Sequence, residues 1–271
     1  MLSSDSISST VDLNKSTPYA NTKSMEMDGV GDYFHPGFTQ AQKETFFRDS
    51  FTISFWGKFN FSNNGWYGFG FQSSSGNATM RMLMINLGGP YGAWYVDGVF
   101  NSQGWNSGFQ ITTNHAGDKL AWLHIALVIE KGASSSDNNK FFLYENGSLL
   151  SSGASFTSNA ATNADMSVAD FTGNPDIAFG AAHSADSGTS TAADMRLDEV
   201  AFFDTALDAT TIAAIYNSGN TFDLTSANGD YKSQANLVRY YRLEDNLTDS
   251  TGTSDGGTEG DPVFSSDTPD S

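Results

Sequence analysis

The chain has 271 residues, of which 38% are hydrophobic and 13% aromatic, so it can bury a substantial core and global disorder is excluded. Thirteen basic and 31 acidic residues give a formal net charge of −18, which argues against binding to nucleic acids or to anionic membrane surfaces. Cysteine is absent, which excludes disulfides, thiolate metal sites and cysteine nucleophiles. No apolar run approaches the ~20 residues that cross a bilayer, and the first residues predict no secretory signal.

The first predicted elements are a polar, extended arm over residues 1–20 and a strand over residues 51–59. Side chains alternate between the two faces of a strand, so this segment presents one hydrophobic face and one mixed face. The hydrophobic face carries Phe51, Ile53, Phe55 and Phe59, and the mixed face carries Thr52, Ser54, Trp56 and Lys58.

Further strands are predicted from similar alternation at 66–72, 80–87, 92–97, 121–130, 140–145, 195–204 and 237–243. Asn146-Gly147 between apolar flanks predicts a type I′ hairpin turn. One short α-helix is expected near residues 209–217, with Asp208 as its N-cap. Many short strands with polar turns between them predict an all-β, antiparallel β-sandwich.

The last part of the chain, residues 246–271, is rich in Asp, Gly, Ser and Thr and has neither Lys nor Arg. This composition predicts a solvated acidic tail that a neighbouring subunit could hold in place. The predicted organisation is therefore an arm over 1–20, one sandwich domain over 21–245 and a tail over 246–271.

Four stretches together resemble the laminin G-like jelly-roll family of the concanavalin A-like lectin/glucanase superfamily. They run in the family's order over about residues 24–219: SMEMDGVGDY at 24–33, FTISFW at 51–56, WLHIALV at 122–128 with FLYENG at 142–147, and LDEVAFFDTAL at 197–207 with IYNSG at 215–219. The resemblance implies a jelly-roll sandwich, and it does not specify a ligand because one fold carries many functions.

The closing segment LVRYYRLED at 237–245 comes after the helix rather than before the domain. This order, continued to the FSSDTP segment at 264–269, is similar to jelly-roll domains in virion proteins of marine tailed phages. The resemblance implies a decoration protein on the surface of a phage capsid or tail. Its expected partners are other virion proteins or copies of itself, and host glycans.

Within the wider fold, a structural Ca²⁺ commonly joins the turn of the first strand to the last strand. Transferred by motif, this resemblance implies Asp28 and Asp198 as ligands, with Asp32 and backbone carbonyls completing the shell. Ca²⁺ prefers several oxygen ligands, and it relieves the repulsion between clustered carboxylates. The alternative is that Asp28-Gly29 is only a turn and Asp198 only ends a strand.

Glucanases of this superfamily carry the motif Glu-x-Asp-x-Glu on one strand, which places two carboxylates on one face. The chain lacks this motif, and Asp198 and Glu199 are neighbours that a regular strand would point to opposite faces. His124 lies within an apolar strand, which favours a hydrogen-bonded packing role. We therefore expect that the chain is not an enzyme.

Aromatic residues in Gly/Asn-rich segments are the candidates for binding a glycan or a partner. An exposed ring can stack on the apolar face of a pyranose, while nearby amides bond to its hydroxyls. The alternative is that these rings fill the sandwich or a subunit contact. The predicted site consists of Trp66, Tyr91, Trp94, Trp105 and Asn106.

Three functions follow from these observations. The first is a phage structural protein that also binds host glycans, without catalysis. The second is a bacterial secreted or cell-surface carbohydrate-binding module. The third is a glucanase-type glycoside hydrolase, which lacks support because the paired carboxylates of that class are missing.

Overall fold

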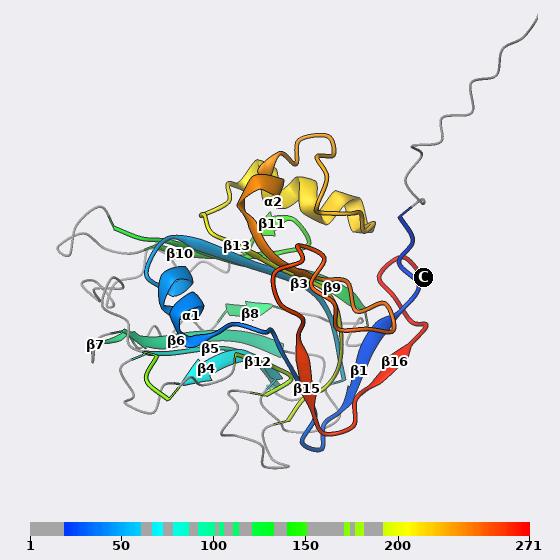
Figure 1. Cartoon of the computed structure of the whole chain (residues 1–271), viewed down its shortest axis with the longest axis horizontal. Coiled ribbons are helices and arrows are strands. Elements are labelled where there is room, and N and C mark those ends of the chain that lie inside the picture. Colours follow the sequence, from blue (N-terminus) through cyan, green and yellow to red (C-terminus); the bar gives the residue numbers. More distant parts are fainter. Residues whose placement is uncertain are drawn as a thin grey trace, which may run out of the picture.

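The computed structural model describes residues 19–60, 67–72, 78–86, 92–100, 103–105, 111–113, 121–132, 140–150, 171–173, 177–181 and 192–271. The strands within these ranges form two antiparallel sheets of eight strands each, stacked face to face (Figure 1). The first sheet has the order β11-β10-β9-β3-β13-β1-β16, with β14 also paired to β13. The second has the order β15-β2-β12-β4-β5-β6-β7, with β8 also paired to β6. The predicted all-β sandwich is confirmed.

The first sheet consists of β1 (Ser24–Asp28), β3 (Phe51–Phe59), β9 (Trp122–Glu130), β10 (Lys140–Glu145), β11 (Ser148–Leu149), β13 (Asp194–Phe203), β14 (Leu237–Tyr241) and β16 (Val263–Ser265). The second consists of β2 (Tyr33–His35), β4 (Tyr67–Gln72), β5 (Ala78–Asn86), β6 (Gly92–Phe100), β7 (Gln103–Trp105), β8 (Ile111–Thr113), β12 (Ala178–Phe179) and β15 (Gly257–Glu259). The helices are α1 (Gln40–Phe47), α2 (Ala209–Tyr216), and the short 3-10 turns η2 (Asn217–Gly219) and η3 (Ser233–Asn236). None of the helices in these described ranges is long and apolar enough to span a membrane.

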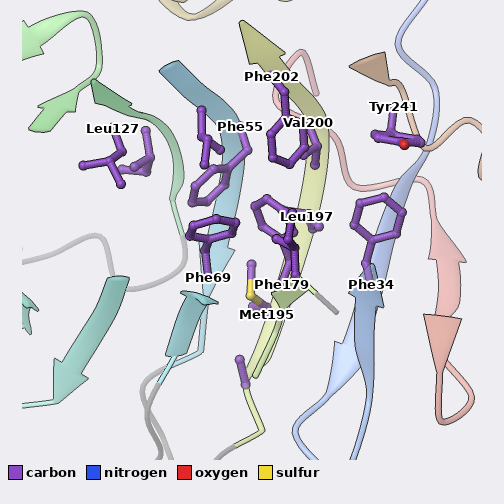
Figure 2. Packing of buried hydrophobic residues seen from close by; sticks show 14 of the residues in the cluster. Phe34, Phe55, Phe69, Leu127, Phe179, Met195, Leu197, Val200, Phe202 and Tyr241 are labelled. Atoms are coloured by element: carbon purple, nitrogen blue, oxygen red, sulfur yellow. The ribbon is translucent and has the colours of Figure 1, made fainter. Parts of the chain in front are cut away.

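The core lies between the two sheets and is dominated by phenylalanine. The hydrophobic face of β3 enters it as the alternation predicts, and Phe55 packs edge-on against Phe179 of β12, with ring centroids 5.4 Å apart. Figure 2 shows rings from both sheets meeting in this layer, with Phe69 and Phe179 opposite the residues of β3 and β13. Such burial is the main favourable contribution to folding.

Helix α1 was not predicted from the sequence. Its hydrophobic residues are few, but Thr39 forms a capping box: its hydroxyl accepts from the Gln42 N–H at 3.3 Å, and Gln42 Oε1 accepts from the Thr39 N–H at 2.9 Å. Phe46 and Phe47 anchor the helix in the core. The helix lies between the levels of the two sheets at one end of the sandwich (Figure 1).

Helix α2 confirms the predicted short helix and covers part of the outer face of the first sheet (Figure 1). Asp208 caps it by accepting the Thr211 N–H at 2.7 Å. Beside α2, Asn146 and Gly147 have φ values of 50° and 73°, as the predicted type I′ turn requires. A Cβ on Gly147 would lie 2.9 Å from the Tyr216 ring, so the hairpin turn packs closely against the end of α2.

Residues 246–271 do not form a tail outside the sandwich, and this corrects the prediction from composition. β15 pairs with β2 in the second sheet, and β16 pairs with β1 in the first. These two strands could not be predicted from the sequence, because each is short and joins its sheet mainly through backbone hydrogen bonds. Such bonds leave no periodic apolar pattern in the sequence. The closing segment is thus part of both layers.

The two neighbours on β16 provide a test of this closing role. Phe264 packs against the core, whereas Val263 is 58% exposed. We expect Phe264→Ala to lower the free energy of unfolding by about 2 kcal/mol and Val263→Ala to change it by less than about 0.5 kcal/mol. Urea unfolding followed by circular dichroism measures both. Equal, negligible effects would show that β16 does not contribute to the folded core.

Candidate functional site

The predicted glycan-binding residues fall mostly outside what the structure describes. Trp66, Tyr91 and Asn106 lie outside the described residues. Trp94 lies in β6 opposite Met84 of β5, and Trp105 lies in β7 opposite Gly98 of β6. These two positions are placed by their backbone alone, so the aromatic site of the second sheet stays a prediction.

A different group of residues gathers on the outer face of the first sheet. In the β3–β9 register, Lys58 is opposite Trp122 and Trp56 is opposite His124. Because side chains alternate along a strand, the outward face of β3 presents Trp56 and Lys58 while Phe55 and Phe59 enter the core. The end of α2 brings Tyr216 over the same face.

These side chains line a cleft of about 440 Å³, which we call the outer cleft. Trp122 and Tyr216 are half-buried at its wall, whereas Trp56 is only 4% exposed beneath them. The remaining lining is mostly polar. The full lining is Trp56, Lys58, Ala121, Trp122, Asn146, Tyr216, Gly219, Asp267, Pro269 and Ser271.

Asp267 holds the polar side of the outer cleft together. Its Oδ1 accepts the Trp122 indole N–H at 2.9 Å, and its Oδ2 lies 2.6 Å from Lys58 Nζ and 3.0 Å from Arg196 Nη1. Burial raises the pKa of Asp267, but the bonds from Lys58 and Trp122 and the nearby Arg196 charge outweigh it, so the pKa lies below its usual value. The ionised carboxylate therefore fixes the orientation of the Trp122 ring.

At the base of the outer cleft, the rings of Trp56, His124 and Tyr216 form a cluster in which each pair is tilted rather than stacked. The centroid of Trp56 lies 5.3 Å from that of His124 and 5.8 Å from that of Tyr216. His124 Nε2 shares a 2.8 Å hydrogen bond with the Ser54 hydroxyl, and complete burial lowers the pKa of His124 to about 3. The imidazole is therefore neutral, and it has the packing role predicted from the sequence.

The three predicted calcium ligands are not brought together. Asp28 and Asp32 are close, since Asp32 Oδ2 accepts the Asp28 N–H at 3.1 Å. However, Asp28 pairs with Asp194 of β13, and Asp198 lies roughly 13 Å further along that strand at ~3.3 Å per residue. Both Asp32 oxygens already accept backbone N–H groups, the second from Asp261 at 2.9 Å.

Among the residues that the structure describes, no group of three or more acidic or histidine side chains could hold a metal ion. The donor set of the predicted calcium shell therefore does not fit the ion. The strand register explains this result, because it separates Asp198 from the first turn. Asp28 instead closes that turn, accepting the Val30 N–H at 2.7 Å.

Asp198 belongs to a buried cluster with Glu199. The β13–β3 register shifts between Asp198 and Ala201, and Glu199 has a φ of 50°, so this part of β13 is a β-bulge. Asn21 Nδ2 lies 2.8 Å from Asp198 Oδ2 and 3.5 Å from Glu199 Oε1. The bulge therefore turns both carboxylates toward the same side, whereas a regular strand would separate them as the sequence analysis assumed.

The surroundings of Glu199 favour its protonated form. Burial raises the pKa of Glu199 to about 8, against opposing hydrogen bonds from the hydroxyls of Tyr19 and Tyr240 and the charge of Arg242. Burial and the neighbouring Glu199 charge raise the pKa of Asp198 as well. The cluster thus ties residues 19–21 to the bulge.

This cluster predicts a pH dependence of stability. A carboxyl whose pKa is higher in the folded chain stabilises it fully below the unfolded pKa, and this contribution is lost as the pH rises through the folded pKa. We expect the free energy of unfolding to fall between about pH 5 and pH 8, and Glu199→Gln to lessen that fall. Urea unfolding at several pH values in this range measures the change in the free energy of unfolding. Glu259→Gln is the control, because Glu259 is exposed on β15. If the free energy of unfolding of Glu199→Gln fell with pH as steeply as that of the unsubstituted chain, Glu199 would not be the group responsible.

Sequence comparison does not identify a family for the chain. No protein-family model matches it, and no curated protein sequence matches it either.

Comparison of structures identifies the fold. A heptameric SAP-like pentraxin from Limulus polyphemus matches with a TM-score of 0.55 and 12% identity, over 90% of this chain and 94% of that chain. A putative carbohydrate-binding protein from Bacteroides ovatus matches with a TM-score of 0.50 and 18% identity, over 92% of this chain and 61% of that one. These likenesses concern the fold alone.

The matched structures also correct the expectation that the chain is not an enzyme. A sialidase from Trypanosoma rangeli is among them, at a TM-score of 0.43 and 14% identity, over 71% of this chain and 27% of the sialidase. The β-bulge at Glu199 also removes the separation of Asp198 and Glu199 on which that expectation partly rested. The sialidase likeness is too weak to argue for an activity. The chain has a jelly-roll β-sandwich fold, like the matched pentraxin and as the resemblance in its sequence implies.

Proposed function

We propose that this jelly-roll domain binds neutral glycans in the outer cleft. The observation that carries the proposal is the half-buried Trp122 ring, held by Asp267 beside Tyr216 at the wall of a mostly polar cleft. Aromatic rings of this kind offer a flat apolar surface to the C–H face of a pyranose, and fixed polar groups beside them bond to its hydroxyls.

The polar groups of the outer cleft suit a ligand with hydroxyl groups. Asn146 offers an amide with both donors and acceptors. Ser271 also lines the cleft, and its hydroxyl is held in place because it donates to the Thr268 carbonyl at 2.6 Å. The Asn146 Oδ1 accepts the His124 N–H at 3.0 Å, so the amide is already oriented before a ligand binds. An oriented polar group costs less free energy on binding than a mobile one.

Charge favours a neutral glycan over an anionic one. Both cations at the polar side are paired: Lys58 with Asp267 at 2.6 Å, and Arg196 with Asp267 at 3.0 Å and Glu26 at 2.9 Å. The chain as a whole carries a formal net charge of −18. An anionic sugar would therefore meet repulsion that no free cation among the described residues of the outer cleft offsets.

The name of the Bacteroides ovatus structure, a putative carbohydrate-binding protein, agrees with this proposal without establishing it. Trp122, Tyr216 and Asp267 are not among the glycan-binding residues predicted from the sequence. Trp122 could have been singled out, since it begins a strand on the mixed face. Asp267 could not, because only the pairing of β16 with β1 brings it there.

Substitution of Trp122 tests the proposal. After a glycan array identifies a neutral oligosaccharide that binds the chain, calorimetric titration compares the variants. We expect Trp122→Ala to raise Kd about tenfold or more, because it removes the stacking surface, and Trp122→Phe to restore part of the affinity.

Leu149→Ala is the matched control, because Leu149 is 44% exposed on β11 of the same sheet and lies outside the outer cleft. Its Kd should equal that of the unsubstituted chain. Glycan binding that survives Trp122→Ala unchanged would place the site elsewhere, for example on the second sheet. An array with no bound neutral glycan would refute the function itself.

The proposal extends to the setting of the domain, the surface of a phage particle, with other virion proteins or copies of itself as partners. It rests on the similarity of residues 237–245 and of the closing segment to virion jelly rolls. We expect mass spectrometry of purified particles to detect the chain at structural stoichiometry. Its absence from the particles would favour the alternative, a bacterial secreted or cell-surface carbohydrate-binding module.

A further inference from the structure

The chain contains three Asn-Gly pairs, at residues 64–65, 146–147 and 228–229. Such a pair is chemically labile, because the glycine has no side chain to shield its backbone nitrogen, which can attack the carboxamide of the preceding asparagine. The pair at 64–65 lies outside the described residues. The other two stand in hairpin turns, and the structure gives them very different surroundings.

The pair at Asn146-Gly147 is held in place. The carboxamide Oδ1 of Asn146 accepts the His124 N–H at 3.0 Å, and the Asn146 N–H donates to the His124 carbonyl at 2.8 Å. A Cβ on Gly147 would lie 2.9 Å from the Tyr216 ring, so the turn also packs against the end of α2. Attack by the Gly147 nitrogen requires the carboxamide to turn away from His124, which happens only when the turn opens locally.

The pair at Asn228-Gly229 is open. Both residues are exposed, and a Cβ on Gly229 would meet nothing within 4 Å. Gly229 has a φ of 55°, as a glycine at the first central position of a hairpin turn adopts. Among the described residues, neither the Asn228 carboxamide nor the Gly229 N–H has a hydrogen-bond partner. The turn is closed on either side of the pair, where Asn228 and Tyr231 exchange backbone hydrogen bonds of 3.1 and 2.9 Å.

We propose that Asn228 is a site of spontaneous deamidation. The Gly229 nitrogen loses its proton and bonds to the Asn228 Cγ, the bond from Cγ to the amide nitrogen breaks, and ammonia leaves with a proton from solvent. The product is a succinimide ring, which water then opens. Attack of water at Cγ gives aspartate, whereas attack at the backbone carbonyl carbon gives isoaspartate, in which the main chain continues through Cγ.

The two products differ in their effect on the turn. Isoaspartate adds the Cβ atom to the main chain, so residue 228 can no longer keep both backbone hydrogen bonds to Tyr231. Tyr231 is fully buried, and its hydroxyl donates to the Leu224 carbonyl at 2.7 Å. It belongs to the hydrophobic cluster that includes Ile212 and Ile215 of α2. Isoaspartate at this turn therefore disturbs the anchor of the segment, whereas aspartate only adds a negative charge at the surface.

The two described pairs make the experiment internally controlled. The full chain is incubated at mildly alkaline pH, digested at mildly acidic pH, and the conversion of each asparagine is followed by tandem mass spectrometry. We expect Asn228 to react at least about tenfold faster than Asn146, because Asn146 reacts only in locally opened molecules. In concentrated urea both pairs are open, so their rates should become similar. An Asn228 that stays intact in the folded chain, or reacts no faster than Asn146, would refute the proposal.

Two variants separate the reaction from its consequence. Asn228→Gln should abolish conversion at residue 228 and leave that of Asn146 unchanged, because a longer side chain must close a larger ring. Asn228→Asp carries the charge of the product with an ordinary backbone. We expect the aged, unsubstituted chain to unfold at a lower urea concentration than Asn228→Asp, in proportion to its isoaspartate content. Equal urea midpoints would overturn the proposed effect on the Tyr231 anchor.

Discussion

The structure depends on the burial of one face of β3 against the second sheet. β3 lies between β9 and β13 in the first sheet, and its phenylalanines meet Phe179 and the residues around it from the opposite layer (Figure 2). Because side chains alternate along a strand, this burial also determines what faces outward. A shift of one residue in the register would bury Lys58 and expose the rings, so the core and the outer cleft are specified together.

The outer cleft shows how a sheet surface becomes a binding site when distant segments close over it. β3 and β9 supply Trp56 and Trp122, α2 supplies Tyr216, and the segment after β16 supplies Asp267. None of these elements could form the cleft alone. The pairing of β16 with β1 thus both completes the first sheet and carries to the cleft the carboxylate that orients Trp122.

The bulge in β13 illustrates a local departure from regular structure with a wider effect. A φ of 50° at Glu199 is unfavourable for a residue with a side chain, and the surrounding hydrogen bonds maintain it. Because of this bulge, Asp198 and Glu199 accept hydrogen bonds from residues 19–21, which hold the beginning of the described chain against β13.

Sequence patterns were enough to predict the β-sandwich, the strand faces, the hairpin at Asn146-Gly147 and helix α2, because these depend on periodicity and on residues close together in the chain. Three features could be seen only in the folded chain: residues 246–271 join both sheets, Asp198 turns beside Glu199 rather than toward Asp28, and Asp267 reaches Trp122. The physical reason is that register, bulges and edge pairing are set by backbone hydrogen bonds between segments far apart in the chain, which leave no pattern in the order of the side chains.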